Sequence, residues 1–266
     1  MNISSVKLIF FSPTKTTRKV LEAVAGGMGT EDVDHMDLTP LDAAERVFDP
    51  LNDELVILGA PVYGGRLPEV AINRFANLKG KNTSAVVIVV YGNREYEDAL
   101  LELKDIAVKQ GFIPVAGAAF IGEHSFNSPE VPLADGRPDA QDLQKAMEFG
   151  KAVKQKLKSI EDLDKESVIN VPGNFPYKER MPHDDECADT IREKCVACGT
   201  CVEVCPTGAV TLEDQVETDS KLCIVCCACV KNCPTGARVM DNPRIKMITK
   251  WLNENYSTPK QPEIFL

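Results

Sequence analysis

Apolar runs of strand length alternate with amphipathic stretches of helix length through the first 160 residues. The expected strands are Val6–Phe11, Val33–Leu38, Glu54–Ala60, Ser84–Tyr91 and Phe112–Ile121. The expected helices are Thr16–Met28, Leu67–Leu78, Tyr96–Gln110 and Asp139–Ser159. Ala85–Val90 is apolar throughout, as in a strand whose two faces are both covered. The alternation predicts an α/β domain with a parallel sheet between two layers of helices.

Five strands in a segment of this length favour the strand order 2-1-3-4-5 over a six-stranded dinucleotide-binding fold. No G-x-G-x-x-G motif follows the first expected strand, which also argues against a dinucleotide site. The order 2-1-3-4-5 places the ligand at the carboxyl ends of the strands, where the direction of strand addition reverses.

After residue 160 the composition changes, and three further segments are expected. Residues 161–186 are first charged and then interrupted by Pro172, Pro176 and Pro182, which predicts a linker on the surface. Residues 187–240 are rich in cysteine and contain an internal repeat. Residues 241–266 contain one expected helix, Arg244–Asn253, followed by a polar end that contains proline.

The charge and the cysteine distribution limit the function classes. The net charge is −10 and no basic stripe is present, which argues against nucleic acid and favours a partner with a positive face. All ten cysteines lie between Cys187 and Cys233, whereas a secreted disulfide scaffold would distribute them through a whole domain. The longest N-terminal apolar run is interrupted by Lys7, so we expect neither an export signal nor a membrane span. We therefore expect a cytoplasmic protein with a metal site.

Two cysteine runs repeat the spacing C-x2-C-x2-C-x3-C-P. CVACGTCVEVCPTGA begins at Cys195 and CIVCCACVKNCPTGA begins at Cys223. Zinc also uses C-x2-C pairs, but a tetrahedral zinc site takes two separated pairs and has no place for a third cysteine at this spacing. The spacing is that of bacterial proteins with two [4Fe-4S] clusters, in which the fourth cysteine of each run binds the other cluster.

Residues 187–240 thus resemble bacterial-type 2[4Fe-4S] ferredoxins, a family that carries single electrons. The resemblance implies a small α+β domain and two ligand sets: Cys195, Cys198, Cys201 and Cys233 for one cluster, and Cys223, Cys226, Cys229 and Cys205 for the other. Cys227 occupies the position that Gly199 has in the first run, and we interpret it as a small apolar filler rather than a ligand. Cys187 also lies outside the pattern and is interpreted as a structural thiol.

Three loops follow expected strands at the edge of the sheet where a ligand is expected. The first, Ser12–Thr17, precedes a helix, where hydroxyls, backbone N–H groups and the helix dipole favour a phosphate. The same cluster of Ser and Thr is also compatible with an ordinary N-cap. The other two loops, Ala60–Arg66 and Tyr91–Tyr96, each present a tyrosine beside flexible or polar residues, which suits a flat ring.

Residues 1–160 resemble flavodoxin on these loops. The family's phosphate motif [ST]-x-T-G-x-T matches at Ser12, Thr14 and Thr17, and its G-D-x-x-Y motif matches as GNREY from Gly92 to Tyr96. The resemblance implies bound FMN. The residues expected to contact FMN are Ser12, Thr14, Lys15, Thr16, Thr17, Pro61, Val62, Tyr63, Gly64, Gly65, Tyr91, Gly92, Asn93, Arg94 and Tyr96.

Within that set the resemblance implies specific roles. The hydroxyl residues of the first loop would hold the FMN phosphate, and Tyr96 would stack on the isoalloxazine ring. Asn93 would lie near the pyrimidine edge, with Tyr63 by the opposite face. Two residues depart from the family pattern: Lys15 replaces a glycine, and Asn93 replaces an aspartate, which would ease reduction of the flavin.

The loop Gly122–Pro138 is too long for a simple connection between a strand and a helix. It is interpreted either as surface decoration or as a cover over the flavin or the cysteine-rich domain, with His124 or Arg137 making the contact. The sequence leaves both interpretations open.

The order of the domains resembles flavodoxin–ferredoxin fusions of the EFR1 type. We expect an electron carrier that relays electrons between the two clusters and FMN and on to a redox partner protein, because flavins handle two electrons and each cluster one. The alternatives are an FMN-dependent reductase of a small substrate fed by the ferredoxin domain, and a redox-sensing module.

Overall fold

A six-stranded sheet lies at the centre of the larger domain. The computed structural model describes residues 5–30, 32–52, 55–81, 83–160, 168–181 and 185–266. The sheet has the order β12-β7-β6-β4-β1-β2. Its strands are β1 (Val6–Phe10), β2 (Val33–Asp37), β4 (Leu55–Pro61), β6 (Thr83–Tyr91), β7 (Phe112–Ile121) and β12 (Glu263–Phe265).

The five parallel strands confirm the predicted flavodoxin-like order. β1 pairs with β2 and β4, β4 with β6, and β6 with β7, all in parallel. Every residue of β6 is buried, as expected for a central strand covered on both faces. The short strands β3 (Leu51–Asn52) and β5 (Gly80–Lys81) form a separate parallel pair, and η1 (Leu41–Ala44) is a single 3₁₀ turn.

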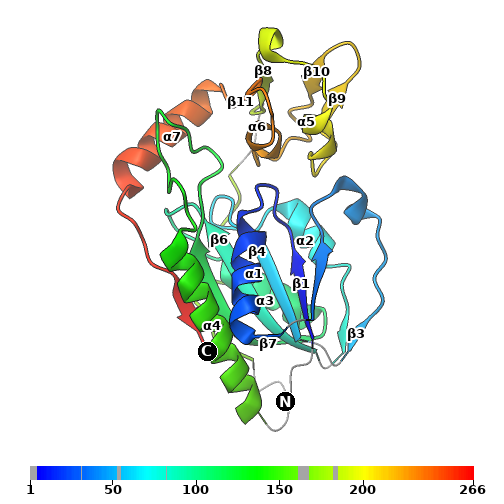
Figure 1. The fold of residues 1–266 in the computed structure, drawn as a ribbon, viewed down its shortest axis with the longest axis vertical. Coiled ribbons are helices and arrows are strands. Elements are labelled where there is room, and N and C mark those ends of the chain that lie inside the picture. The colour runs from blue at the N-terminus through cyan, green and yellow to red at the C-terminus, as the bar shows by residue number, and fades with distance from the viewer. Residues whose placement is uncertain (1–4, 31, 53–54, 82, 161–167, 182–184) are drawn as a thin grey trace.

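Helices cover both faces of the sheet (Figure 1). α1 (Thr16–Met28) and α4 (Ala140–Ser159) contribute to one apolar core, and α2 (Glu69–Phe75) and α3 (Ala99–Lys109) contribute to the other. Two glycines allow α1 and α4 to approach closely. A Cβ at Gly27 or Gly150 would lie 2.0 Å from a backbone oxygen of the opposite helix, which no real contact permits.

The sixth strand was not predicted. α7 (Pro243–Tyr256) is longer than the expected helix and begins after Asn242, whose side chain accepts hydrogen bonds from two amides of the first turn. The chain then descends along the edge of the sheet, and Glu263–Phe265 pairs antiparallel with Gly117–Ala119 of β7 (Figure 1). Three residues are too few to show an alternating pattern, but they cover a sheet edge that would otherwise be exposed.

The cysteine-rich domain lies over the carboxyl ends of the sheet strands (Figure 1). It contains the antiparallel pairs β9 (Val210–Leu212) with β10 (Val216–Thr218), and β8 (Asp189–Thr190) with β11 (Arg238–Val239), together with the turn η3 (Arg192–Lys194). Two short helices, α5 (Thr200–Glu203) and α6 (Ala228–Lys231), occupy equivalent places in the two cysteine runs.

The described part of the expected linker, residues 168–181, is mostly exposed but anchored at a few points. Ile169 is buried in the sheet core, and its N–H donates to the carbonyl of Pro114 (2.9 Å). The Asp98 carboxylate accepts from the backbone N–H groups of Asn174 (2.8 Å) and Lys178 (2.7 Å). Residues 161–167 and 182–184 of the expected linker lie outside the described residues.

None of the helices in the described part of the chain has the length and apolar character that a membrane crossing requires.

Candidate cofactor sites

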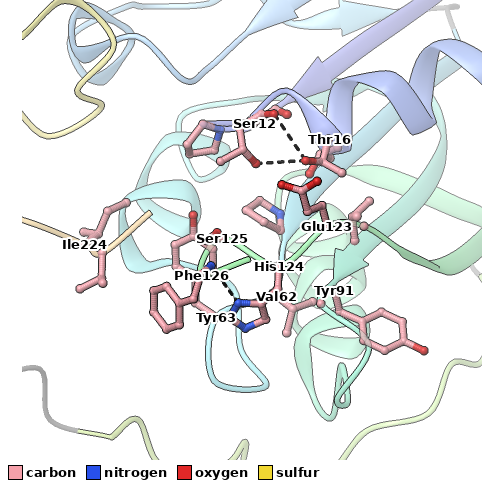
Figure 2. A pocket seen from close by; sticks show the side chains of 18 of the residues that line it. Ser12, Thr16, Val62, Tyr63, Tyr91, Glu123, His124, Ser125, Phe126 and Ile224 are labelled. Carbon is pink, nitrogen blue, oxygen red and sulfur yellow. Dashed lines mark hydrogen bonds between the residues drawn. The ribbon is translucent and has the colours of Figure 1, made fainter. Parts of the chain in front are cut away.

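A cavity of about 190 Å³ lies at the carboxyl ends of the parallel strands, and we call it the sheet-edge cavity. Figure 2 shows the side chains that line it. They come from the loops after β1, β4, β6 and β7 and from the cysteine-rich domain. The lining residues are Ser12, Pro13, Thr14, Thr16, Thr17, Pro61, Val62, Tyr63, Gly64, Val90, Tyr91, Gly92, Gly122, Glu123, His124, Ser125, Phe126, Ile224 and Val225. Ten of the fifteen residues predicted to contact FMN are in this set.

The first loop has the geometry of an anion site. Lys15 is the N-cap of α1 and adopts a left-handed conformation with φ of 63°, which is the conformation that a glycine in this position would provide. The Ser12 hydroxyl accepts from the N–H of Arg18 (3.1 Å), and the hydroxyls of Thr14 and Thr16 are 3.0 Å apart. The amides in the first turn of a helix have no partner within the helix, so they and these hydroxyls can bind a phosphate.

Lys15 does not line the sheet-edge cavity but an adjoining cavity of about 300 Å³. The two cavities share five residues: Thr14, Thr16, Glu123, His124 and Ser125. The adjoining cavity is lined by the side chains of four cations: Lys15, Lys19, Arg137 and Lys231. The departure from the family's glycine thus keeps the backbone of the loop and adds a positive charge at its outer end.

The second loop brings Tyr63 between the cavity and the cysteine-rich domain. Burial raises the pKa of Tyr63 well above its ordinary value, and the nearby thiols of Cys226 and Cys227 raise it further. Gly64 has φ of 61° and open space where a Cβ would point, so its backbone is accessible from the cavity. Gly65, in contrast, is buried under Glu97 and does not line the cavity.

The third loop corrects the prediction made from the G-D-x-x-Y motif. Only Tyr91 and Gly92 of this loop line the cavity, whereas Asn93, Arg94 and Tyr96 do not. Tyr96 is 5% exposed and packs edge to face on Tyr91, with the ring centroids 5.4 Å apart, so its ring is not available for stacking. The expected stacking role of Tyr96 therefore does not hold in this structure.

Asn93 and Tyr96 instead bind the C-terminal segment. The Asn93 amide donates to the carbonyls of Tyr256 (2.6 Å) and Thr258 (2.9 Å), and its oxygen accepts from the N–H of Lys260 (2.9 Å). The Tyr96 hydroxyl donates to Glu263 (2.8 Å). A sequence motif cannot reveal this use, because the partners lie more than 160 residues further along the chain.

The long loop Gly122–Pro138 covers the cavity and also contacts the cysteine-rich domain. Glu123, His124, Ser125 and Phe126 form one wall (Figure 2). Glu123 pairs with Lys231 of α6 (2.6 Å). Of the two interpretations left open by the sequence, the structure supports the cover and not surface decoration.

His124 is one of the loop residues that line the cavity. Its Nδ1 accepts from the N–H of Phe126 (3.1 Å), and its ring lies so close to Gly92 that a Cβ there would be 2.3 Å from a ring carbon. Burial, together with the smaller effects of the charges of Arg94 and Lys231, lowers the pKa of His124 to about 4. The imidazole is therefore neutral at physiological pH. Arg137 binds Asp142 at the start of α4 and lines the adjoining cavity but not the sheet-edge cavity.

Two hollows in the cysteine-rich domain match the two ligand sets. The outer cysteine hollow is lined by Cys195, Cys198, Cys201 and Cys233. The inner cysteine hollow is lined by Cys205, Cys223, Cys226 and Cys229. Each hollow thus combines three cysteines of one run with the fourth cysteine of the other run, as the spacing predicts. Within the described residues, no three His, Cys, Asp or Glu side chains converge on a single ion. Four thiols around one hollow fit a group larger than a single ion.

Of the two spare thiols, Cys227 lies at the inner cysteine hollow. Cys227 lines it, is 3% exposed and has a left-handed backbone with φ of 58°, as Gly199 has in the first run with φ of 78°. Burial raises the pKa of Cys227, so it stays a protonated thiol. Cys187 is close enough to Cys229 for the two thiols to interact electrostatically, and burial also raises the pKa of Cys187.

One residue separates the inner cysteine hollow from the sheet-edge cavity. Ile224 lies between the expected ligands Cys223 and Cys226 in the sequence and lines both spaces. Figure 2 shows it at the sheet-edge cavity. It also packs against the core of the larger domain. This contact could not be predicted, because Ile224 is an ordinary apolar residue within a ligand motif.

A buried arginine joins the two domains at another point. Arg74 of α2 is 2% exposed and donates to the carbonyls of Leu38, Thr39 (2.7 Å) and Pro206 (2.6 Å). Pro206 directly follows Cys205, and the Thr39 hydroxyl accepts from the N–H of Ser12 (2.7 Å). Arg74 therefore connects the residue that follows the expected ligand Cys205 with Thr39, which contacts the first loop at Ser12.

The fold and these cavities define an α/β domain of flavodoxin-like topology joined to a small cysteine-rich domain with a 4Fe-4S binding motif. Comparison with protein families gives one match, in which residues 188–211 match Fer4, the 4Fe-4S binding domain. This match contains the first cysteine run. A search of curated proteins found no match.

Solved structures of flavodoxins are similar to the chain. Flavodoxin 2 from Bacillus cereus is 19% identical with a TM-score of 0.42, over 57% of this chain and 99% of that one. A flavodoxin from the domain Archaea is 16% identical with a TM-score of 0.36, over 58% and 99%. The Fusobacterium nucleatum flavodoxin bound to flavin mononucleotide is 12% identical with a TM-score of 0.37, over 57% and 98%.

Proposed function

We propose that this chain is an electron-transfer protein that relays electrons between two [4Fe-4S] clusters and FMN, and on to a partner protein. The observation that carries the proposal is the shared wall at Ile224, which borders both the sheet-edge cavity and the inner cysteine hollow. A fused pair of redox domains gains from such closeness, because electrons then pass within one molecule.

The residues present fit FMN. The anion loop of Ser12, Thr14, Thr16 and Thr17 would hold the phosphate, with Lys15 and Lys19 supplying positive charge nearby. Val62, Tyr63 and the Gly64 peptide would border the ring on the side of the cysteine-rich domain, and Gly92 and His124 would border it on the other. Bound there, FMN would couple two-electron and one-electron chemistry.

The residues also fit two clusters in a definite order. The cluster held by Cys205, Cys223, Cys226 and Cys229 would lie next to the flavin, and the one held by Cys195, Cys198, Cys201 and Cys233 would lie further out. Cys198 is exposed and the neighbouring Val196 is 65% exposed, whereas three of the four inner cysteines are buried. The outer cluster is therefore the proposed point of contact with the partner protein.

The proposal is tested by anaerobic purification of the full chain, followed by iron, sulfide, zinc and flavin analysis. We expect about eight iron atoms per chain and one flavin. Cys198→Ser should lose about half of the iron, whereas Cys187→Ser, which replaces a spare thiol, should keep all of it. Zinc in place of iron, or a chain that binds no FMN, would refute the proposal. Oxidation of the reduced flavin by a small molecule without any partner protein would favour the reductase alternative.

A further inference from the structure

Arg238 is a buried cation between the two cysteine hollows. It lies on β11, immediately after the second CPTGA sequence, and is 3% exposed. Its guanidinium lines the outer cysteine hollow and also donates to the Sγ of Cys229, a residue of the inner hollow, at 3.7 Å. One side chain thus reaches residues of both ligand sets.

The other partners of Arg238 are neutral. The guanidinium donates to the hydroxyls of Thr190 (2.6 Å) and Thr218 (2.7 Å) and to the carbonyl of Ala188 (3.0 Å), while its Nε has no acceptor. No carboxylate of the described chain pairs with it. A buried charge without a counter-charge is costly, and a negatively charged cluster in either hollow would offset that cost.

The internal repeat has an apolar residue at the position equivalent to Arg238. The equivalent residue after the first CPTGA sequence is Val210, which is also 3% exposed and lines the inner hollow. The equivalent position thus holds an apolar side chain in the first half of the domain and a cation in the second half.

We propose that Arg238 is a positioning residue for the redox groups, which holds a positive charge between the two cluster sites and raises the reduction potentials of the clusters. The inference depends on the proposed function, because it presupposes that both hollows hold clusters. A cluster and its four thiolates carry negative charge, and each electron added makes the charge more negative by one. A fixed cation and an N–H···S hydrogen bond both stabilise the more negative state.

The test is a redox titration of the full, cluster-loaded chain, followed by electron paramagnetic resonance with dithionite as the reductant. Arg238→Met removes the charge at similar volume, and Arg192→Met removes an exposed charge from the same domain as a matched control. At the ambient potential where wild-type clusters are half reduced, we expect the ratio of reduced to oxidised clusters to fall about tenfold in Arg238→Met. This change equals about 59 mV for a one-electron couple. In Arg192→Met it should stay within about twofold, because solvent screens that charge.

Arg238→Lys and Arg238→Gln keep the test decisive if Arg238→Met does not retain its iron. Lysine keeps the charge and glutamine keeps N–H donors without it, so the potentials should be lower in the glutamine variant than in the lysine variant. Equal potentials in these two variants, or wild-type potentials in a fully loaded Arg238→Met, would overturn the inference. Iron and flavin contents report on the proposed function separately, because a fully loaded chain with unchanged potentials refutes the role of Arg238 alone.

Discussion

Asn93 gives the sharpest prediction, because the structure changes its role from flavin contact to anchor of the C-terminal segment. In Asn93→Asp the oxygen that accepts from Lys260 remains, but the group that donates to the carbonyls of Tyr256 and Thr258 becomes a second oxygen. Two hydrogen bonds are lost at about 1 kcal/mol each, and the new oxygen repels both carbonyls. The local opening of the segment should therefore become easier by about 2–3 kcal/mol, which corresponds to about 30- to 150-fold in its opening equilibrium.

Hydrogen exchange of the β12 amides, Glu263–Phe265, measures this opening directly. Asn93→Gly is the matched variant, because glycine accepts the φ of 68° at this position and removes all three hydrogen bonds without adding a charge. Both variants should exchange faster in β12, and the amides of β6 should be unaffected. Exchange within about threefold of wild type in both variants would contradict the assignment of Asn93 as the anchor.

Two further predictions concern the cavity and the cysteines. Cys227→Gly should retain all of its iron, because glycine fits the left-handed backbone that Gly199 has in the first run, and loss of half of the iron would instead identify Cys227 as a ligand. His124 is neutral in the folded chain with a pKa of about 4, below its ordinary 6.5, so between these values the unfolded state binds a proton that the folded state does not. Stability should fall as the pH is lowered through this range, by up to about 2 kcal/mol at pH 5. Denaturant unfolding at pH 7 and pH 5 should show this loss in the wild type but not in His124→Gln, and equal pH dependence in the two proteins would contradict it.

The fold and the grouping of the cysteines around two hollows could be predicted because their signals are local, whereas the role of these cysteines as cluster ligands stays a prediction. Strand alternation, the continuous apolar run of β6 and the x2 and x3 spacings of the cysteines are all contained in short windows of sequence. The position of the first loop at the sheet-edge cavity was also predictable, since it follows a strand at the edge of the sheet where ligands bind. Lys15, which replaces the glycine of the motif in this loop, adopts the left-handed backbone conformation that a glycine would provide.

The contacts of the third loop and of the domain interface were not predictable, because they join residues that lie far apart in the sequence. GNREY matches a flavin-binding motif, but whether its side chains reach a cavity depends on what else packs against them. The C-terminal segment occupies Asn93 and Tyr96, and only the folded chain brings these regions together. Similarly, Ile224 acquires its place between two cavities from the docking of one domain on the other.

The contacts between the domains support a fixed relay rather than a pair of tethered domains. Arg74 is buried and bonded to backbone carbonyls on both sides of the interface, and Lys231 pairs with Glu123 on the cover of the sheet-edge cavity. Breaking the Arg74 contact would leave a buried guanidinium without one of its acceptors, which is costly. A flexible linker would make electron transfer between the domains depend on how often they meet. In the proposed relay the two anchored contacts remove that dependence, so the step that the net negative charge and the ionic strength can control is the encounter with the outside partner.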